Sequence, residues 1–246
     1  MMIGRMNTYG GEGPSSVGVR NGFCLWREFC ESTNSHYYSD GAVAMFDHHD
    51  VLDTLTWNES EQLGVALDHI EKVNTFLCSF GRSHRQEAFL EDAPWYPMVS
   101  ECDGHIFTDY REGYHRTVDV YREPWMPSSC IAVSGDKGQV AQLFGKAVVL
   151  FDDKEANIDT LRRRSTLDCP LDGVVVRRGR KSRQSVLSGY QVANDIDSWL
   201  GTVEALVSEF SLPRIVMHHP PSPADGGGGT ARDQLQHHGS AGVEWV

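Results

Sequence analysis

Residues 42–57 read AVAMFDHHDVLDTLTW, and in this stretch an apolar run ends in a cluster of Asp and His before apolar residues return. A short run that is apolar at every position predicts a strand covered on both faces, as in a parallel sheet between helices. In open parallel sheets, ligands bind beyond the carboxyl ends of the strands. The polar residues from Asp47 to Asp50 therefore stand where a binding site is expected.

Four more runs of this kind follow along the chain, and helical patterns separate several of them. They are TFLCSF at 75–80, HIFT at 105–108, AVVLF at 147–151 and GVVV at 173–176. Strands that alternate with helices favour the α/β class. We therefore expect a three-layer, Rossmann-like parallel sheet with helices on both faces.

Two segments have the spacing of amphipathic helices. In the first, apolar residues recur at steps of three and four at Leu63, Ala66, Leu67 and Ile70. Asn58 with Glu61 three residues later predicts a capping box at its start. In the second, the same steps run from Ala193 to Phe210 and predict the helix that closes the domain.

Composition divides the chain into three parts. Residues 41–215 are expected to form one α/β domain, in which residues 81–130 are either an insertion or a loop-rich crossover. Residues 1–40 are predicted to be a largely irregular N-terminal segment. Residues 216–246, rich in Gly, Pro and His, are predicted to be a disordered tail because they bury too little apolar surface to offset their ordering entropy.

The overall charge of the chain disfavours two classes of negatively charged partner. The chain has 246 residues with 34 acidic and 22 basic side chains, a formal charge of -12, which argues against a general binder of nucleic acid or anionic membrane. No apolar run approaches the roughly 20 residues needed to cross a bilayer. No secretory signal is recognisable at the N-terminus, so the expected location is cytoplasmic. The six Cys form no CxxC pair, which disfavours a zinc ribbon or a dithiol redox site.

Carboxylates follow two of the predicted strands. The run AVAMF continues into Asp47, and AVVLF continues into Asp152 and Asp153. On neighbouring strands these side chains would be close enough to share a hard cation, and Mg²⁺ prefers such oxygen ligands. Charged residues are also ordinary strand terminators, so either group alone has a purely structural explanation.

Four sequence segments, two of which contain these acids, resemble in their order the motifs of a known family. VVLFDDKEANI, from residue 148, resembles the fourth motif of the haloacid dehalogenase-like (HAD-like) hydrolase superfamily, in which an apolar strand ends in paired Asp. FDHHDVL, from residue 46, resembles the first motif, usually FDxDGxL. FLCSF places Ser79 at the second-motif position, and SGDKGQVAQLF supplies Lys137 as in the third. The resemblance covers residues 42–180 in the correct order.

The resemblance implies a Mg²⁺-dependent phosphatase that acts on a phosphorylated small molecule or another phosphoester. Asp47 would be the nucleophile and would form an aspartyl-phosphate. The ion would be held by Asp47, by Asp152 or Asp153, and by the backbone carbonyl of His49. Ser79 and Lys137 would bind the phosphoryl oxygens.

Two positions depart from the family pattern. The second Asp of the first motif, which serves the family as general acid and base, is replaced by His49, and the following Gly is replaced by Asp50. An imidazole has an ordinary pKa near 6.5, which suits proton transfer at neutral pH. The replacement leaves open two readings, a phosphatase in which His49 transfers the proton and a catalytically degenerate HAD-like module that binds or regulates.

The letters DHH at 47–49 support a third reading. They resemble the signature of the DHH phosphoesterases, in which Asp and His hold a pair of manganese ions, and adjacent His suit a transition metal. That family also needs an earlier strand that ends in an Asp-rich motif. Only NSHYYSD, from residue 34, precedes this stretch, and it does not fit.

One basic stretch stands out in this acidic chain. RRGRKSR at 177–183 either attracts a polyanionic substrate, such as a nucleotide or a nucleic-acid end, or forms an ordinary solvated loop. The residues alone leave both explanations open.

Overall fold

The computed structural model describes residues 22–32, 41–81, 89–109, 118–123 and 126–211. The predicted C-terminal tail, 216–246, lies outside the described residues. So does most of the predicted N-terminal segment, apart from one helix.

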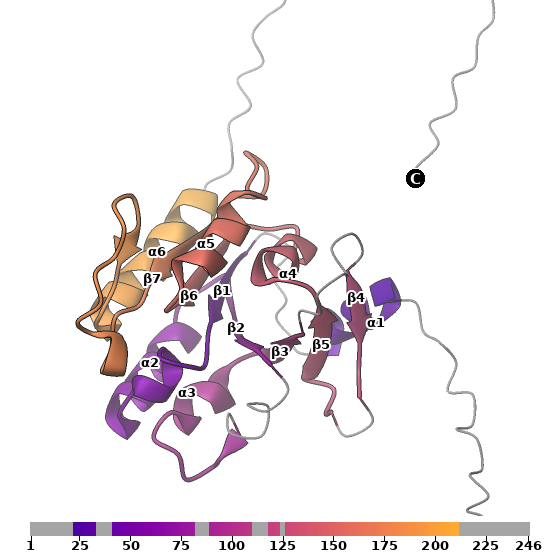
Figure 1. The fold of residues 1–246 in the computed structure, drawn as a ribbon. Coiled ribbons are helices and arrows are strands. Elements are labelled where there is room, and N and C mark those ends of the chain that lie inside the picture. The colour runs from indigo at the N-terminus through magenta and orange to yellow at the C-terminus, as the bar shows by residue number, and fades with distance from the viewer. Residues whose placement is uncertain (1–21, 33–40, 82–88, 110–117, 124–125, 212–246) are drawn as a thin grey trace, which may run out of the picture. The chain divides into compact units, whose positions relative to one another are not determined.

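The described strands form one sheet, with the order β4-β5-β3-β2-β1-β6-β7-β8 (Figure 1). The strands are β1 (Ala42–Phe46), β2 (Val73–Phe80), β3 (Gly104–Thr108), β4 (Asp119–Tyr121), β5 (Cys130–Ser134), β6 (Val148–Asp152), β7 (Leu171–Val175) and β8 (Gln191–Val192). Neighbouring strands are parallel except for β4 and β5, which are antiparallel. The α/β class and the five predicted strands are confirmed. The apolar strand β5 was not among the predicted runs.

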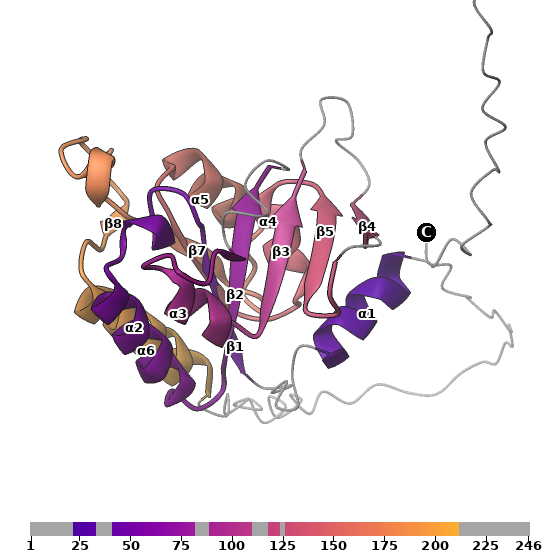
Figure 2. The same cartoon turned by 90° about the horizontal axis from the view of Figure 1, so that it is seen from below.

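Helices lie on both faces of the sheet. They are α1 (Gly22–Ser32), α2 (Trp57–Asp68), α3 (Tyr96–Glu101), α4 (Lys137–Leu143), α5 (Glu155–Arg162) and α6 (Ile196–Ser211). Side chains alternate along β1, so that Ala44 and Phe46 pack in the cluster with α2, α3 and α6, whereas Val43 and Met45 pack in the cluster with α1, α4 and α5. Figure 2 shows α2 and α6 next to each other on one face. Among the described residues, no helix has both the length and the apolar character that crossing a membrane requires.

The capping box of α2 differs from the prediction. The helix begins at Trp57, and its N-cap is Thr56, whose hydroxyl accepts from the backbone N–H of Glu59 at 3.3 Å. The Glu59 carboxylate accepts in return from the Thr56 N–H at 2.9 Å. The predicted pairing of Asn58 with Glu61 is therefore wrong, because a Thr-x-x-Glu box two residues earlier satisfies the free N–H groups first.

Helix α1 lies within residues 1–40, for which the sequence predicts little regular structure. Its Trp26 packs on Phe144 with ring centroids 5.0 Å apart, and its Phe29 packs on Phe76 at 5.9 Å. Trp26 and Phe29 are both buried. Helix α1 therefore contributes to the hydrophobic core beside β1, β2 and α4.

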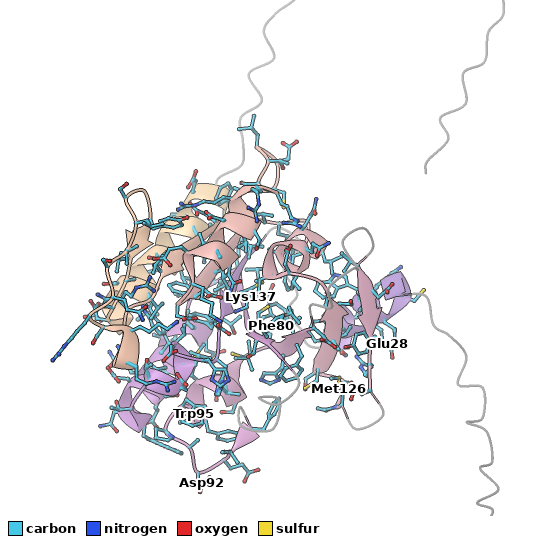
Figure 3. The ribbon with its side chains drawn as sticks, viewed as in Figure 1. Glu28, Phe80, Asp92, Trp95, Met126 and Lys137 are labelled. Carbon is cyan, nitrogen blue, oxygen red and sulfur yellow. The ribbon has the colours of Figure 1, made fainter. Side chains whose placement is uncertain are left out.

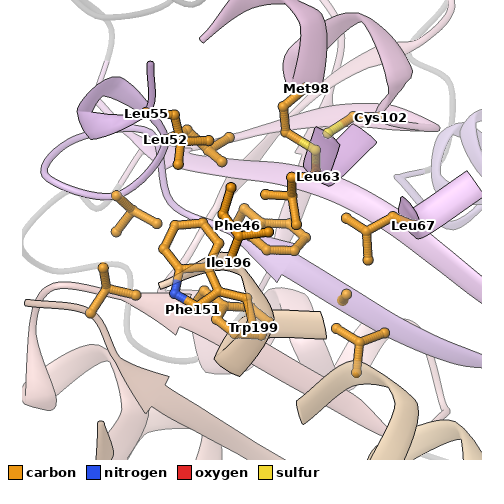
Figure 4. Packing of buried hydrophobic residues seen from close by; sticks show 14 of the residues in the cluster. Phe46, Leu52, Leu55, Leu63, Leu67, Met98, Cys102, Phe151, Ile196 and Trp199 are labelled. Carbon is orange, nitrogen blue, oxygen red and sulfur yellow. The ribbon is translucent and has the colours of Figure 1, made fainter. Parts of the chain in front are cut away.

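Three aromatic rings hold β1 and β6 together beneath the sheet's carboxyl edge. Phe46 and Phe151 are register partners and stack with centroids 4.7 Å apart, and Trp199 of α6 packs on Phe46 at 6.0 Å and on Phe151 at 5.6 Å (Figure 4). All three are fully buried, and burial of each ring stabilises the fold by roughly 2–3 kcal/mol. The residues that follow Phe46 and Phe151 are Asp47 and Asp152, so this packing fixes how close the acids lie.

Helices α4 and α5 approach each other closely at Gly138. Its N–H donates to the Thr160 hydroxyl at 3.0 Å, and a Cβ added at Gly138 would overlap the backbone carbonyl of Thr160 and lie 2.9 Å from the Leu161 nitrogen. Backbone atoms cannot move aside as the end of a side chain can. A glycine at this position therefore permits the approach that places Lys137 beside β6.

Gly138→Ala is expected to lower the free energy of unfolding by about 1–3 kcal/mol, because the added methyl overpacks the contact between α4 and α5. Gly201→Ala in α6 is the matched control. Nothing lies within 4 Å of a Cβ at Gly201, so that change should be neutral or stabilising by up to about 1 kcal/mol. Urea denaturation measures both variants, and equal effects would contradict the packing argument.

Candidate functional site

Three buried carboxylates meet at the carboxyl edge of the central strands. Asp47 follows β1, Asp152 ends β6 and Asp153 follows it, and one oxygen from each lies within 4.8 Å of the others. Strands β1 and β6 are parallel neighbours, and the Asp47 N–H donates to the Phe151 carbonyl at 2.9 Å. The prediction that the two acid-tipped strands lie side by side is confirmed.

The Lys137 ammonium contacts two of these carboxylates, those of Asp47 and Asp152. Its Nζ lies 2.9 Å from Asp47 Oδ1 and 2.6 Å from Asp152 Oδ2, and its side chain is 2% exposed. Asp136 caps the first turn of α4 by accepting from the Gln139 N–H at 2.8 Å, which fixes the start of the helix. Lys137 is the first residue of α4 and lies close to the central strands (Figure 3).

Protein donors occupy both oxygens of Asp152. The Asn157 side-chain amide donates to Oδ1 at 3.0 Å and to Oδ2 at 2.9 Å, and the Lys154 N–H donates to Oδ1 at 2.8 Å. Together with Lys137, these donors hold the carboxylate in one orientation. Asn157 was not among the predicted site residues, although its position on the first turns of the helix after β6 was the available signal.

Asp153 keeps one oxygen available to a ligand. The Lys181 ammonium contacts its Oδ2, and the buried Arg177 guanidinium donates to its backbone carbonyl. Its Oδ1 is buried and has no hydrogen-bond partner among the described residues. An unsatisfied carboxylate oxygen beside two more carboxylates fits an oxygen-preferring divalent cation such as Mg²⁺.

Ser79 lies at the same edge of the sheet, near the end of β2. Strands β1 and β2 are parallel neighbours with Phe46 opposite Leu77, so Ser79 is two residues beyond that pair in the direction of Asp47. The residue is 1% exposed, and its Oγ has no hydrogen-bond partner among the described residues. A buried hydroxyl without a partner is costly, which points to a ligand that would accept its hydrogen bond.

The surroundings of Asp47 and Lys137 shift the pKa values of both side chains. Burial raises the pKa of Asp47 to about 6, the Lys137 ammonium opposes that rise, and the Asp152 and Asp153 carboxylates add to it. For Lys137, burial alone would lower the pKa, but the adjacent Asp152 and Asp47 carboxylates outweigh burial and raise it. Lys137 is therefore a permanent cation, and Asp47 is the carboxylate whose charge state depends on what binds nearby.

The loop after β1 accommodates the missing glycine. Asp50, at the position where the resembling motif has Gly, has φ 56°, in the left-handed region that Gly favours. Asp and Asn tolerate this conformation better than other side chains do. In the same loop the His48 N–H donates to Asp47 Oδ1 at 2.8 Å. The turn therefore holds a non-glycine residue, Asp50, in a conformation that glycine favours.

The two histidine rings of this loop do not join the carboxylate group. His49 Nδ1 lies 3.5 Å from Asp53 Oδ2, and its side chain is 31% exposed. The buried His48 ring packs edge-on against Trp95 with centroids 5.4 Å apart. Among the described residues, the one group of metal-ligand side chains this close together consists of Asp47, Asp152 and Asp153.

The chain matches no protein-family model, no curated protein and no solved structure.

The raised pKa of Asp47 gives a pH prediction for the metal-free protein. The carboxyl has a pKa of about 6 when folded and about 4 when unfolded, so it holds its proton longer in the folded state. Its penalty on stability is absent below about pH 4, grows as the pH rises, and is complete only above about pH 7. Between about pH 4 and pH 7, in the presence of EDTA, wild type should lose about 2 kcal/mol of unfolding free energy relative to Asp47→Asn.

Urea denaturation of both proteins across this pH range measures the difference, and the comparison cancels the contributions of other carboxylates. A difference that stays constant with pH would contradict the assignment.

Lys137→Met is expected to destabilise the metal-free protein by about 3–5 kcal/mol, because it leaves Asp47 and Asp152 buried without their shared cation. Lys154→Met is the control. Lys154 is exposed, and its backbone N–H makes the hydrogen bond to Asp152, which the substitution retains. Thermal melts at neutral pH with EDTA compare the two, and similar small shifts would show that Lys137 does not neutralise the site.

Proposed function

We propose that the protein is a Mg²⁺-dependent phosphoester hydrolase in which Asp47 is the nucleophile. The observation that carries the proposal is the group formed by Asp47, Asp152 and Asp153, with the Lys137 ammonium between two of its members. The order of the HAD-like motifs along the chain supports the same chemistry, since the motif residues Asp47, Ser79, Lys137, Asp152 and Asp153 are buried. The motif residue His49 is partly exposed.

The contacts of Asp47 assign separate roles to its two oxygens. The His48 N–H and the Lys137 ammonium both contact Oδ1, so we assign attack on phosphorus to Oδ2. A bond forms between Oδ2 and phosphorus while the bond from phosphorus to the leaving oxygen breaks, which gives an aspartyl-phosphate. Water then attacks phosphorus, releases phosphate and restores the carboxylate.

Other residues stabilise the charge that moves in these steps. The Ser79 hydroxyl donates to a phosphoryl oxygen, and Lys137 offers a fixed positive charge close to the reacting group. Asp47 and Asp153 would hold Mg²⁺, which when bound would neutralise negative charge and so allow one anion to approach another. Asp152 keeps Lys137 and the start of α5 in place rather than contacting substrate, because protein donors already occupy both of its oxygens.

His49 is the proposed proton donor to the leaving oxygen and the proton acceptor from water. Its contact with Asp53, at 3.5 Å, orients the ring within the loop. Burial raises the pKa of the Asp53 carboxyl, and its interaction with His49 opposes that rise. General acid–base catalysis contributes roughly 10²–10⁴-fold to a rate, which sets the size of the effect expected from His49.

The contact between His49 and Asp53 also favours a second candidate function. If the His49 ring remains with Asp53, the site can bind a divalent cation and phosphate but transfers protons poorly. The protein would then be a HAD-like binding or regulatory module. The manganese-dependent DHH reading has less support, because neither His48 nor His49 belongs to the carboxylate group.

Wild-type protein is expected to hydrolyse p-nitrophenyl phosphate with Mg²⁺ and to lose this activity in EDTA. Asp47→Asn should lower kcat at least about 10³-fold because it removes the nucleophile, whereas His49→Ala should lower it by about 10²–10⁴-fold. Asp92→Asn, which alters an exposed acid, is the control and should keep full activity.

Calorimetric titration with Mg²⁺ accompanies the assay. Binding without turnover would select the binding module over the enzyme. Turnover that persists in Asp47→Asn would contradict the proposed nucleophile.

A further inference from the structure

The basic stretch at 177–183 begins at the same sheet edge as the carboxylates. Strand β7 is parallel to β6, with Val175 opposite Asp152, so the residues after β7 continue past the end of β6. Figure 2 shows the loop after β7 close to the loop after β1. A Cβ added at Gly179 would lie 3.0 Å from Thr54 Cγ2, which confirms that the two loops touch.

The first two arginines of the stretch hold the loop in place. The buried Arg177 guanidinium donates to the Asp153 carbonyl and to the Glu155 carboxylate. Arg178 donates to the Glu59 carboxylate at 2.7 Å and to the Asn194 carbonyl at 3.1 Å. Both cations are neutralised within the fold, so they act as anchors and are not available to a ligand.

The next two cations face the rim of the site. Gly179 has φ +53°, and this turn directs the chain into the short 3-10 helix η3 (Gly179–Lys181). The Arg180 guanidinium lies 3.5 Å from Asp50 Oδ1 and its side chain is 85% exposed. The Lys181 ammonium contacts Asp153 and lies 3.9 Å from Asp50 Oδ2.

The charges at this rim change when a divalent cation binds. In the metal-free arrangement, Asp153 and Asp50 together balance Lys181 and Arg180. A cation held by Asp153 would neutralise the charge that Lys181 now neutralises. Lys181 and Arg180 would then share one carboxylate, that of Asp50, beside the site proposed for the phosphoryl group. An uncompensated positive charge next to a site attracts a second anionic group.

We propose that Arg180 and Lys181 form a second phosphate subsite, so that the preferred substrate is a phosphoester with a second phosphate group. This inference rests on the proposed function and names the substrate class of that site. A guanidinium presents paired N–H donors that match phosphate oxygens, and Lys adds a mobile point charge. The exposed Arg180 is free to turn toward such a group, because its contact with Asp50 is long and solvent-accessible.

Calorimetry with unreactive phosphonates tests the subsite without relying on turnover. The probes are propylphosphonate, with one anionic group, and ethane-, propane- and butane-bisphosphonate, with two groups at increasing separation. With saturating Mg²⁺, at least one bisphosphonate should bind wild type about 10-fold or more tightly than propylphosphonate does. Arg180→Gln should reduce this advantage to about 2-fold and leave the affinity for propylphosphonate unchanged. Lys181→Gln should reduce the same advantage.

Arg163→Gln is the matched control, since it removes the same charge from an exposed residue at the C-terminal end of α5. An equal loss in Arg163→Gln, or a bisphosphonate advantage that survives in Arg180→Gln, would overturn the subsite. If propylphosphonate binds and no bisphosphonate binds more tightly, the subsite is wrong and the proposed function stands. If no phosphonate binds, the proposed function fails as well.

Discussion

The structure depends on one buried cation, Lys137, at the point where two acidic strand ends converge. Ionised carboxylates that are removed from water destabilise a fold unless a positive charge lies close to them. Lys137 contacts Asp47 at 2.9 Å and Asp152 at 2.6 Å, and the two carboxylates in turn keep its pKa raised despite burial. A single ammonium therefore makes it possible to keep Asp47 and Asp152 out of solvent, and a second ammonium, that of Lys181, contacts the third acid, Asp153.

Strand register, helix packing and the loop after β7 position the charged side chains of the site. The stacked rings of Phe46 and Phe151 fix the register of β1 against β6, so the acids that follow them emerge at the same level. Gly138 lets α4 approach α5, so that Lys137 and Asn157 both contact Asp152. The anchored loop after β7 adds Lys181 to Asp153. Packing far from any ligand thus determines the electrostatics of the site.

The sequence predicted the parts of this structure that local pattern controls. Apolar runs identified five strands, and parallel topology was enough to place Asp47 beside Asp152 and Asp153. Contacts between residues remote in sequence could not be predicted from such patterns. The hydrogen bond from Arg178 to Glu59 joins positions 119 residues apart, and no periodicity in the sequence indicates it. The capping box was misplaced because two overlapping patterns competed within one turn of sequence. The His48 ring packs on Trp95, and the His49 ring contacts Asp53. The sequence DHH alone could not predict either ring position.

The central claim is that the acidic ends of β1 and β6 hold one divalent cation between them. The most direct measurement is an anomalous difference map from crystals of the protein soaked in Mn²⁺, which replaces Mg²⁺ at oxygen-lined sites and scatters anomalously. The account predicts one strong peak within about 2.5 Å of oxygens from both Asp47 and Asp153, with the Lys181 ammonium displaced from Asp153. A map without a peak at this position, or with its main peak on the His48 and His49 rings, would contradict it.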